Sequence, residues 1–423
     1  MDHFNLSNGS IHAESVSLEA IAQAVGTPVY VYSQATLERH VRVFREAVSG
    51  AGKGEPLVAF AVKANPNGAV LRTMARAGMG ADVVSGGELM RALAAGILPE
   101  NIIFSGVGKT REEMALGLSH GIGQFNLESE PEAEMLSAVA SAMGVEAKVA
   151  YRVNPDVDAG THAKISTGKS ENKFGIPIDT AIDAYARAAA LPGLKLQGVA
   201  VHIGSQLTDL APLETAFGKV GALVSALRAE GHDITLADLG GGLGVPYDPA
   251  LPLPPSPTDY GAMVRRATAG WDVRLAFEPG RLIVANAGVL LSRVIRVKEG
   301  VSQPWVILDA AMNDLLRPSL YDAWHDIRAV KPKGEKAAAN VVGPVCESGD
   351  TFATARHMDV VAADDLVVFM TAGAYGATMA GTYNSRALAP EVMVSGDQWA
   401  VVRPRQPLSA LIDAERVPDW LAD

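Results

Sequence analysis

The chain has 423 residues, 48% of them hydrophobic, which is enough for two domains with sizeable cores. A formal charge of −11 without a long basic block argues against nucleic acid and anionic membrane surfaces as partners, and a single cysteine, Cys346, excludes an internal disulfide and a CxxC-type zinc site. No run of about 18 uncharged apolar residues is present, and residues 1–5 lack the basic then apolar start of a signal peptide, so we expect a cytoplasmic protein without a membrane span. We also expect no metal site.

The first two thirds of the chain alternate short apolar segments with helix-like segments. Eight of the apolar segments predict strands: 57–62, 81–84, 102–104, 124–127, 147–153, 198–203, 235–239 and 273–277. Such alternation is typical of parallel strands joined by crossover helices, and eight repeats fit a (β/α)8 TIM barrel. A doubly wound sheet is the alternative.

Polar residues follow these strands, which favours the barrel because TIM barrels build their sites at the C-terminal ends of their strands. In chain order these residues are Lys63, Ser85, Ser105, Asn126, Arg152 with Asn154, His202, Gly240–Gly242 and Glu278. The long segment 154–175 leaves the same end, and we expect a lid there, with a surface excursion as the alternative. The segment 246–257 holds six prolines and predicts an extended surface loop without chemistry of its own.

After residue 285 the sequence changes to β-branched runs separated by turns, at 289–297, 305–309, 341–342, 366–370 and 391–394. This pattern predicts a mainly antiparallel β domain. The run 28–32 precedes the barrel in sequence and is expected to add a strand to this β domain. We therefore predict a barrel domain at 36–285 and a discontinuous β-rich domain formed by 1–35 and 286–423.

Lys63 ends the apolar run 57–62. Partial burial disfavours the ammonium form, and a free amine is a nucleophile for an aldehyde. Lys63 is thus a candidate for a Schiff base with pyridoxal 5′-phosphate. The alternative is a solvated lysine at a strand end.

Three other segments at strand ends suit the same cofactor. The backbone N–H groups of Gly240–Gly242 can converge on a phosphate, although a glycine run is often only a tight turn. Glu278 would keep the pyridine nitrogen protonated and Arg281 would face substrate or phosphate; a surface ion pair between them is the alternative. His202 would stack on the ring with Ser205 reaching the phosphate, unless it is a structural histidine.

Several motifs extend this pattern over nearly the whole chain: FAVKAN (60–65), ADVVSGGE (81–88), HIGSQ (202–206), GGGLG (240–244), EPGR (278–281), RPSLY (317–321) with Ala323 and His325, CESGD (346–350), GAYG (373–376) and YNSR (383–386). With them the chain resembles the alanine-racemase-like, fold type III group of pyridoxal phosphate enzymes, most closely the branch that decarboxylates meso-diaminopimelate. One departure is Asn172, where many relatives have Ser before Lys-Phe-Gly.

The resemblance implies roles for individual residues. The cofactor-binding residues it implies are Lys63, Asp82, His202, Ser205, Gly240, Gly241, Gly242, Glu278, Gly280, Arg281 and Tyr375. The substrate-binding residues it implies are Arg281, Arg317, Tyr321, Glu347 and Tyr375. Lys63, His202 and Cys346 are the implied catalytic residues, with Cys346 as the proton donor. Family members place Cys346 and Glu347 in the partner subunit's site, which implies a homodimer with shared active sites.

We therefore expect decarboxylation of meso-2,6-diaminopimelate to L-lysine and CO2, the last step of lysine biosynthesis. Two arginines suit the distal carboxylate of this substrate, because guanidinium groups bind carboxylates bidentately. A decarboxylase of ornithine, arginine or lysine would instead need an acidic distal pocket. A racemase would usually place arginine, not Glu278, at the pyridine nitrogen. A non-catalytic pyridoxal phosphate-binding relative is the remaining alternative.

Overall fold

The protein is described by a computed structural model that covers residues 2–158 and 173–421. Its chain divides into two units, Leu37–Ile283 and a second unit formed by Met1–Thr36 with Val284–Asp423. The expected lid at 154–175 lies mostly outside the described residues. Within those residues no helix is long and apolar enough to cross a membrane.

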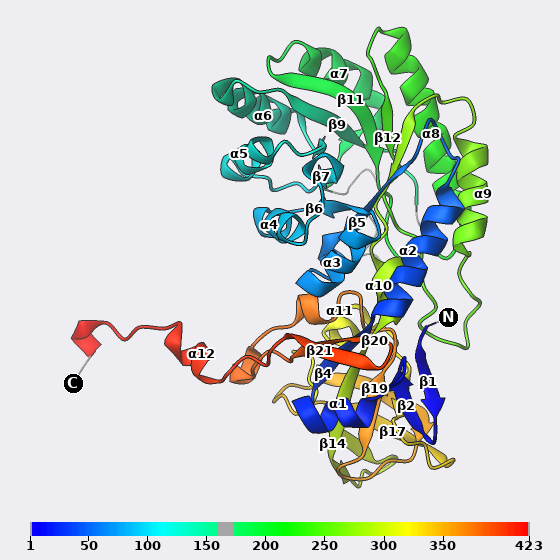
Figure 1. Cartoon of the computed structure of the whole chain (residues 1–423), viewed down its shortest axis with the longest axis vertical. Coiled ribbons are helices and arrows are strands. Elements are labelled where there is room, and N and C mark those ends of the chain that lie inside the picture. Colours follow the sequence, from blue (N-terminus) through cyan, green and yellow to red (C-terminus); the bar gives the residue numbers. More distant parts are fainter. Residues whose placement is uncertain (1, 159–172, 422–423) are drawn as a thin grey trace. The chain divides into compact units, whose positions relative to one another are not determined.

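The first unit is a closed barrel of eight parallel strands, in which β13 pairs with β5 and β8 pairs with β9 (Figure 1). The strands are β5 (Leu57–Ala61), β6 (Gly80–Val83), β7 (Ile102–Phe104), β8 (Gln124–Leu127), β9 (Ala147–Asn154), β11 (Leu194–Val201), β12 (Leu236–Asp238) and β13 (Arg274–Phe277), with β10 (Ile176–Pro177) paired to β9. They are the eight strands predicted from the sequence. The TIM barrel is confirmed, and the doubly wound alternative is wrong.

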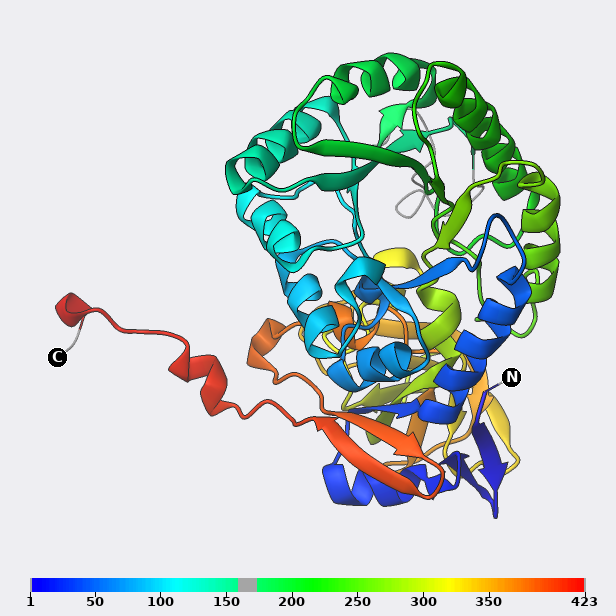
Figure 2. The same ribbon diagram turned by 45° about the horizontal axis from the view of Figure 1, so that its top comes forward.

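Helices form the outer ring of the barrel (Figure 2). They are α2 (Gln34–Val48), α3 (Gly68–Arg76), α4 (Gly86–Ala94), α5 (Arg111–His120), α6 (Glu130–Met143), α7 (Ala181–Ala189), α8 (Ala211–Ala229) and α9 (Pro257–Ala267). The short helix α10 (Arg281–Val284) and the 3-10 turns η1 (Val62–Ala64), η2 (Pro99–Asn101) and η4 (Ile178–Thr180) lie in the connections. Side-chain caps start α4 and α6 within a few residues of the preceding strand, because Ser85 and Ser129 accept hydrogen bonds from Glu88 and Glu132 backbone N–H groups. Such short connections hold the side chains that follow the strands at one end of the barrel.

The second unit is built on a nine-stranded, mainly antiparallel sheet. Its strands are β4 (Val29–Ser33), β14 (Gly288–Lys298), β15 (Trp305–Leu308), β16 (Ile327–Ala329), β17 (Lys336–Val342), β18 (Thr351–Asp359), β19 (Leu366–Phe369), β20 (Glu391–Ser395) and β21 (Gln398–Arg403). β4 pairs with β14 and β20, so the predicted strand at 28–32 does join this sheet and the β domain is discontinuous. Alternate residues such as Val29, Val31 and Val392 bury one face in a common core.

Smaller elements complete the second unit. They are the three-stranded sheet β1 (Phe4–Ser7), β2 (Ser10–Ala13) and β3 (Val16–Ser17), the helices α1 (Leu18–Val25), α11 (Arg317–Tyr321) and α12 (Ser409–Asp413), and the turns η5 (Ala285–Ala287), η6 (Ala377–Met379), η7 (Tyr383–Ser385) and η8 (Asp419–Leu421).

Candidate active site

Lys63 lies in η1, directly after β5, at the C-terminal end of the barrel. Its ammonium lies 3.1 Å from Asp82 Oδ2 on the neighbouring strand β6. The Asp82 side chain is fully buried, whereas 38% of the Lys63 side chain is exposed. Asp82 Oδ1 is buried without a hydrogen-bond partner in the part of the chain that the structure describes. An amine that a ligand can reach therefore sits beside a buried acid with spare hydrogen-bonding capacity.

Glu278 follows β13 and is buried in the barrel close to two other carboxylates, Asp238 of β12 and Asp82. Ser105 Oγ lies 3.5 Å from Glu278 Oε1. Burial raises the pKa of Glu278 well above its usual value, and the charges of Asp238 and Asp82 add to this shift while Lys63 opposes it. Glu278 is thus a buried carboxyl group with a raised pKa, close to the partly exposed Lys63 side chain.

His202 follows β11, and its Nδ1 accepts a hydrogen bond of 3.3 Å from the Gly241 N–H. Burial lowers the pKa of His202 well below its ordinary value, and the cations Arg152 and Lys63 lower it further. The imidazole is therefore neutral, and because Nδ1 accepts, its proton is on Nε2. This gives a flat, uncharged ring fixed to the glycine turn.

The glycine turn after β12 leaves no room for side chains. A Cβ on Gly240 would lie 2.5 Å from Val201 O, and a Cβ on Gly241 would lie 2.3 Å from Glu278 O. Gly240 and Gly242 also have positive φ angles of 65° and 117°. The Gly240 N–H already donates to Asp238 Oδ1, and the Gly241 N–H donates to His202. The glycines thus let three backbone segments approach each other closely at the barrel's end.

Arg281 is buried at the start of α10 and donates hydrogen bonds to the side chains of Ser205 and Tyr247. Its Nε and Nη2 donate to Ser205 Oγ at 3.3 and 3.1 Å, and its Nη1 donates to Tyr247 OH at 2.8 Å. Gly280 precedes it in a close approach to β5, where a Cβ would lie 3.0 Å from Ala61 Cβ. Ser205 and Arg281, both predicted to bind cofactor, therefore lie together. Tyr247 belongs to the proline-rich segment 246–257, and its contact with Arg281 was not predicted from the sequence.

Two buried ion pairs support this end of the barrel and were not identified as such in the sequence. Arg152 Nη1 lies 3.2 Å from Glu128 Oε1, and its guanidinium lies 4.7 Å from the centre of the Phe174 ring. Lys109 Nζ lies 2.5 Å from Glu132 Oε1 and also donates to two backbone carbonyls. Arg152 was predicted at a strand end from the sequence, but the acids Glu128 and Glu132, with which these cations pair, were not identified.

In the second unit, Arg317 is buried at the start of α11. Its Nη1 donates to His325 Nε2 at 2.7 Å, and His325 Nδ1 donates to Met370 O at 3.0 Å. The histidine therefore carries its proton on Nδ1 and orients the guanidinium. Tyr321 ends the same short helix.

Cys346 and Glu347 are exposed in the turn between β17 and β18. The buried Asp350 carboxylate shapes this turn by accepting hydrogen bonds from Met312 N at 2.6 Å and Val345 N at 2.7 Å. The turn and α11 are adjacent, since Ser319 Oγ donates to Gly349 O at 2.5 Å.

Tyr375 lies in a tight turn after β19 and has a positive φ of 55°. A non-glycine residue in this conformation is strained, and such strain is often found at functional positions. The structure thus gathers two sets of predicted residues, each within its own unit. The barrel holds Lys63, Asp82, His202, Ser205, Gly240–Gly242, Glu278, Gly280 and Arg281, and the β-rich unit holds Arg317, Tyr321, Cys346, Glu347 and Tyr375.

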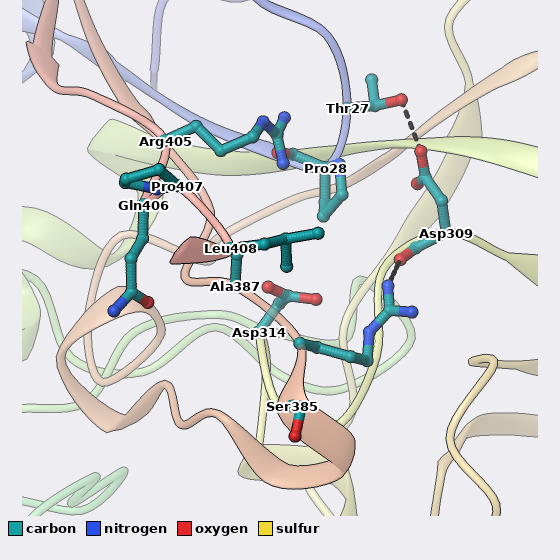
Figure 3. A pocket seen from close by; sticks show the side chains of 11 residues that line it. Thr27, Pro28, Asp309, Asp314, Ser385, Ala387, Arg405, Gln406, Pro407 and Leu408 are labelled. Carbon is teal, nitrogen blue, oxygen red and sulfur yellow. Dashed lines mark hydrogen bonds between the residues drawn. The ribbon is translucent and has the colours of Figure 1, made fainter. Parts of the chain in front are cut away.

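A cavity of about 590 Å³ in the β-rich unit contains none of these residues (Figure 3). Its charged groups are engaged with the protein: Asp309 accepts from Thr27 Oγ1, and Arg386 donates to Asp309 O. We therefore place the candidate site at the end of the barrel, where the titratable groups converge.

Comparison with known proteins identifies the class. Residues 34–285 match the family model described as "Pyridoxal-dependent decarboxylase, pyridoxal binding domain". With the TIM barrel and its strand-end lysine, this match defines a pyridoxal-dependent decarboxylase. The chain is 56% identical to the diaminopimelate decarboxylase of Zymomonas mobilis over 99% of both chains. It belongs to the diaminopimelate decarboxylase family, as its sequence motifs predicted.

Solved structures agree with this assignment. Diaminopimelate decarboxylase from M. jannaschii in co-complex with L-lysine superposes with a TM-score of 0.95 at 36% identity, covering 100% of this chain and 99% of the other. The Helicobacter pylori enzyme complexed with L-lysine superposes with a TM-score of 0.89 at 39% identity, covering 94% and 98% of the two chains.

Proposed function

We propose that the protein decarboxylates meso-2,6-diaminopimelate to L-lysine and CO2 with pyridoxal 5′-phosphate as cofactor, in the last step of lysine biosynthesis. The observation that carries this proposal is the partly exposed Lys63 amine beside the buried carboxyl groups of Asp82 and Glu278. Membership in the diaminopimelate decarboxylase family supports the choice of substrate.

The residues at the end of the barrel fit the cofactor. Lys63 offers a partly exposed amine, Asp82 Oδ1 is an unpartnered buried acceptor among the described residues, and the glycine turn brings backbone segments together where no side chain would fit. When bound, pyridoxal phosphate supplies an electron-poor ring that stabilises the electron pair left as CO2 departs. Lys63 would hold its aldehyde carbon, and Glu278 would share a proton with its pyridine nitrogen.

Other barrel residues would hold the rest of the cofactor. The neutral His202 ring would pack against the pyridine ring without adding a charge to it. Ser205, Gly240–Gly242 and Gly280 would bind the phosphate, together with Arg281 and, from the β-rich unit, Tyr375. Asp82 would orient the Lys63 amine through their ion pair.

The substrate has an amino-acid group at each end, and the non-reacting end must be held for the scissile bond to be aligned. We propose that Arg281, Arg317 and Tyr321 bind the distal carboxylate, that Glu347 binds the distal amine and that Tyr375 contacts the substrate. His325 would then orient Arg317. Cys346 Sγ would deliver a proton to the carbon that has lost CO2.

We further propose a homodimer in the cytoplasm, with residues 36–285 as the cofactor-binding domain and 1–35 with 286–423 contributing to the substrate site and dimer interface. Cys346 and Glu347 are exposed in the single chain, which leaves them available to a second copy. Mixing the inactive variants Lys63→Ala and Cys346→Ala should restore activity in heterodimers. Heterodimers that stay inactive would show that each subunit's site is self-contained.

The function is tested in four incubations of the pure protein with added pyridoxal phosphate, each with one amino acid: meso-diaminopimelate, ornithine, arginine or lysine. We expect CO2 and an equal amount of L-lysine from meso-diaminopimelate alone. Release of CO2 from ornithine but not from meso-diaminopimelate would reject the proposal in favour of another basic amino-acid decarboxylase.

A further inference from the structure

Inside the barrel, the carboxyl groups of Asp238 and Glu278 are hydrogen-bonded to each other. They come from the neighbouring strands β12 and β13 and are almost fully buried, with 1% and 9% of each residue exposed. Asp238 has no role in the family motifs described above. Because two ionised carboxylates have no proton to share, this contact requires that the pair hold one proton.

The surrounding hydrogen bonds show on which side the proton lies. Asp238 Oδ1 accepts from the Gly240 N–H at 3.0 Å, and Asp238 Oδ2 accepts from Asn126 Nδ2 at 3.0 Å. Two donors stabilise the ionised form of Asp238. Glu278 Oε1 accepts a long hydrogen bond of 3.5 Å from the Ser105 hydroxyl, which stabilises an ionised carboxylate less. The proton is therefore on Glu278, which donates to Asp238.

Asn126 is oriented by a chain of amides that runs through the barrel. Gln197 Nε2 donates to Gln124 Oε1 at 3.0 Å, and Gln124 Nε2 donates to Asn126 Oδ1 at 2.8 Å. Asn126 Nδ2 must then point to Asp238 and Ser105. This chain fixes Asp238 as an acceptor, so the direction of the Asp238–Glu278 hydrogen bond is built into the barrel.

We propose that Asp238 is a positioning residue for the proposed decarboxylation. It holds Glu278 in place through one shared proton, and its negative charge raises the proton affinity of the cofactor's ring nitrogen beside Glu278. The inference rests on the proposed function. A ring nitrogen that arrives protonated would donate to Glu278, so the carboxyl pair would keep its shared proton and its charge of −1, and no proton would have to be transferred. The charged groups that face Glu278 are Asp238 and Asp82, which favour retaining the proton, and Lys63, which opposes it.

The test moves the acid while keeping the hydrogen bonds. In Asp238→Asn alone, the new amide would meet the Asn126 amide as a second donor, and the variant can misfold. In the double variant Asp238→Asn with Asn126→Asp, the carboxylate at position 126 accepts from Gln124 and from the new amide at position 238. Glu278 then faces an amide donor, which favours the ionised form of Glu278. Glu278→Gln is a second variant that does not disturb Asn126, and Asp233→Asn, at an exposed position, is the matched control.

Infrared spectra of the full chain without cofactor report the proton directly, through the carbonyl stretch of a protonated carboxyl group. We expect this band at pH 7 in the wild type and in Asp233→Asn, and its loss in Glu278→Gln and in the double variant. A band that persists in Glu278→Gln and in the double variant would overturn the inference. A wild-type chain that shows the band but binds no pyridoxal phosphate would refute the proposed function without refuting the carboxyl pair.

In the chain loaded with pyridoxal phosphate, the visible absorption titrates with the ring nitrogen. Moving the carboxylate from position 238, the direct partner of Glu278, to position 126 should move this transition to lower pH by about one unit in the double variant, a tenfold loss in proton affinity. If the role of Asp238 is purely structural, the pH of this absorption transition should not change. Coinciding titrations of the wild type and the double variant would therefore reject the positioning role.

Discussion

The glycine turn offers a sharp test of the cofactor site, through the substitution Gly241→Ala. The added Cβ would lie 2.3 Å from Glu278 O and 3.1 Å from Glu278 C, which are backbone atoms that cannot rotate away. Contacts under 3.0 Å essentially never occur for real Cβ atoms, so the turn after β12 or the end of β13 must shift. Overpacking of this kind costs about 1–3 kcal/mol. The shift would also disturb the hydrogen bond from Gly241 N–H to His202.

If this free energy is lost from cofactor binding, the dissociation constant for pyridoxal phosphate should rise roughly 5- to 150-fold. Fluorescence or absorbance titration of the cofactor-free chain measures it. Gly218→Ala is the matched control, because Gly218 lies inside α8 with nothing within 4 Å of its added Cβ, and the change should be neutral or slightly stabilising. Equal cofactor affinity in Gly241→Ala, Gly218→Ala and the wild type would refute the reasoning.

Three further substitutions test the supporting structure. Lys109→Met leaves the buried Glu132 without its cation, so the free energy of unfolding should fall by about 3–5 kcal/mol in urea titrations, and an unchanged value would contradict the burial argument. Burial raises the pKa of Asp314 to about 6, above its unfolded value of roughly 3.9, so the wild type should lose stability as pH rises through this interval. Asp314→Asn should remove that dependence and be more stable at pH 7 by on the order of 1–3 kcal/mol; parallel stability curves from pH 4 to 7 would show otherwise. Arg281→Lys keeps the charge but loses the forked contacts to Ser205 and Tyr247, so cofactor affinity should fall by roughly tenfold or more in equilibrium titrations, and wild-type affinity would oppose a phosphate role.

The barrel was predictable because its parallel strands are buried on both faces and read as short apolar runs. β7 and β8 have the predicted bounds, 102–104 and 124–127. β11 begins at Leu194, earlier than the predicted residue 198, because its first half is only partly buried and has a mixed polar sequence. Alternation of apolar runs alone cannot reveal such an extension.

The β-rich unit was harder to predict where strands are short or exposed. β18 and β21 were missed, since most residues of β21 are exposed and β18 mixes apolar with polar residues without a regular alternation. β17 was seen only at 341–342, although it begins at Lys336, because its first half is exposed and rich in alanine. Tertiary pairing with neighbouring strands, which a single sequence does not reveal, decides these elements.

For the site, the sequence could identify residues that follow strands but not the contacts between distant segments. Asp238 falls inside a predicted strand, and its pairing with Glu278 was not predicted. Tyr247 lies in a proline-rich loop, and only the folded chain shows its contact with Arg281. A carboxylate two residues before a glycine run was the one available signal for Asp238.

The central claim is that Lys63 is the amine that binds pyridoxal phosphate. Borohydride reduction of the loaded chain, followed by peptide mapping, tests it most directly. We expect a single pyridoxyl group, on the peptide that contains Lys63, and none in a Lys63→Ala variant. A pyridoxyl group on another lysine of the wild-type chain, or none at all, would contradict the claim.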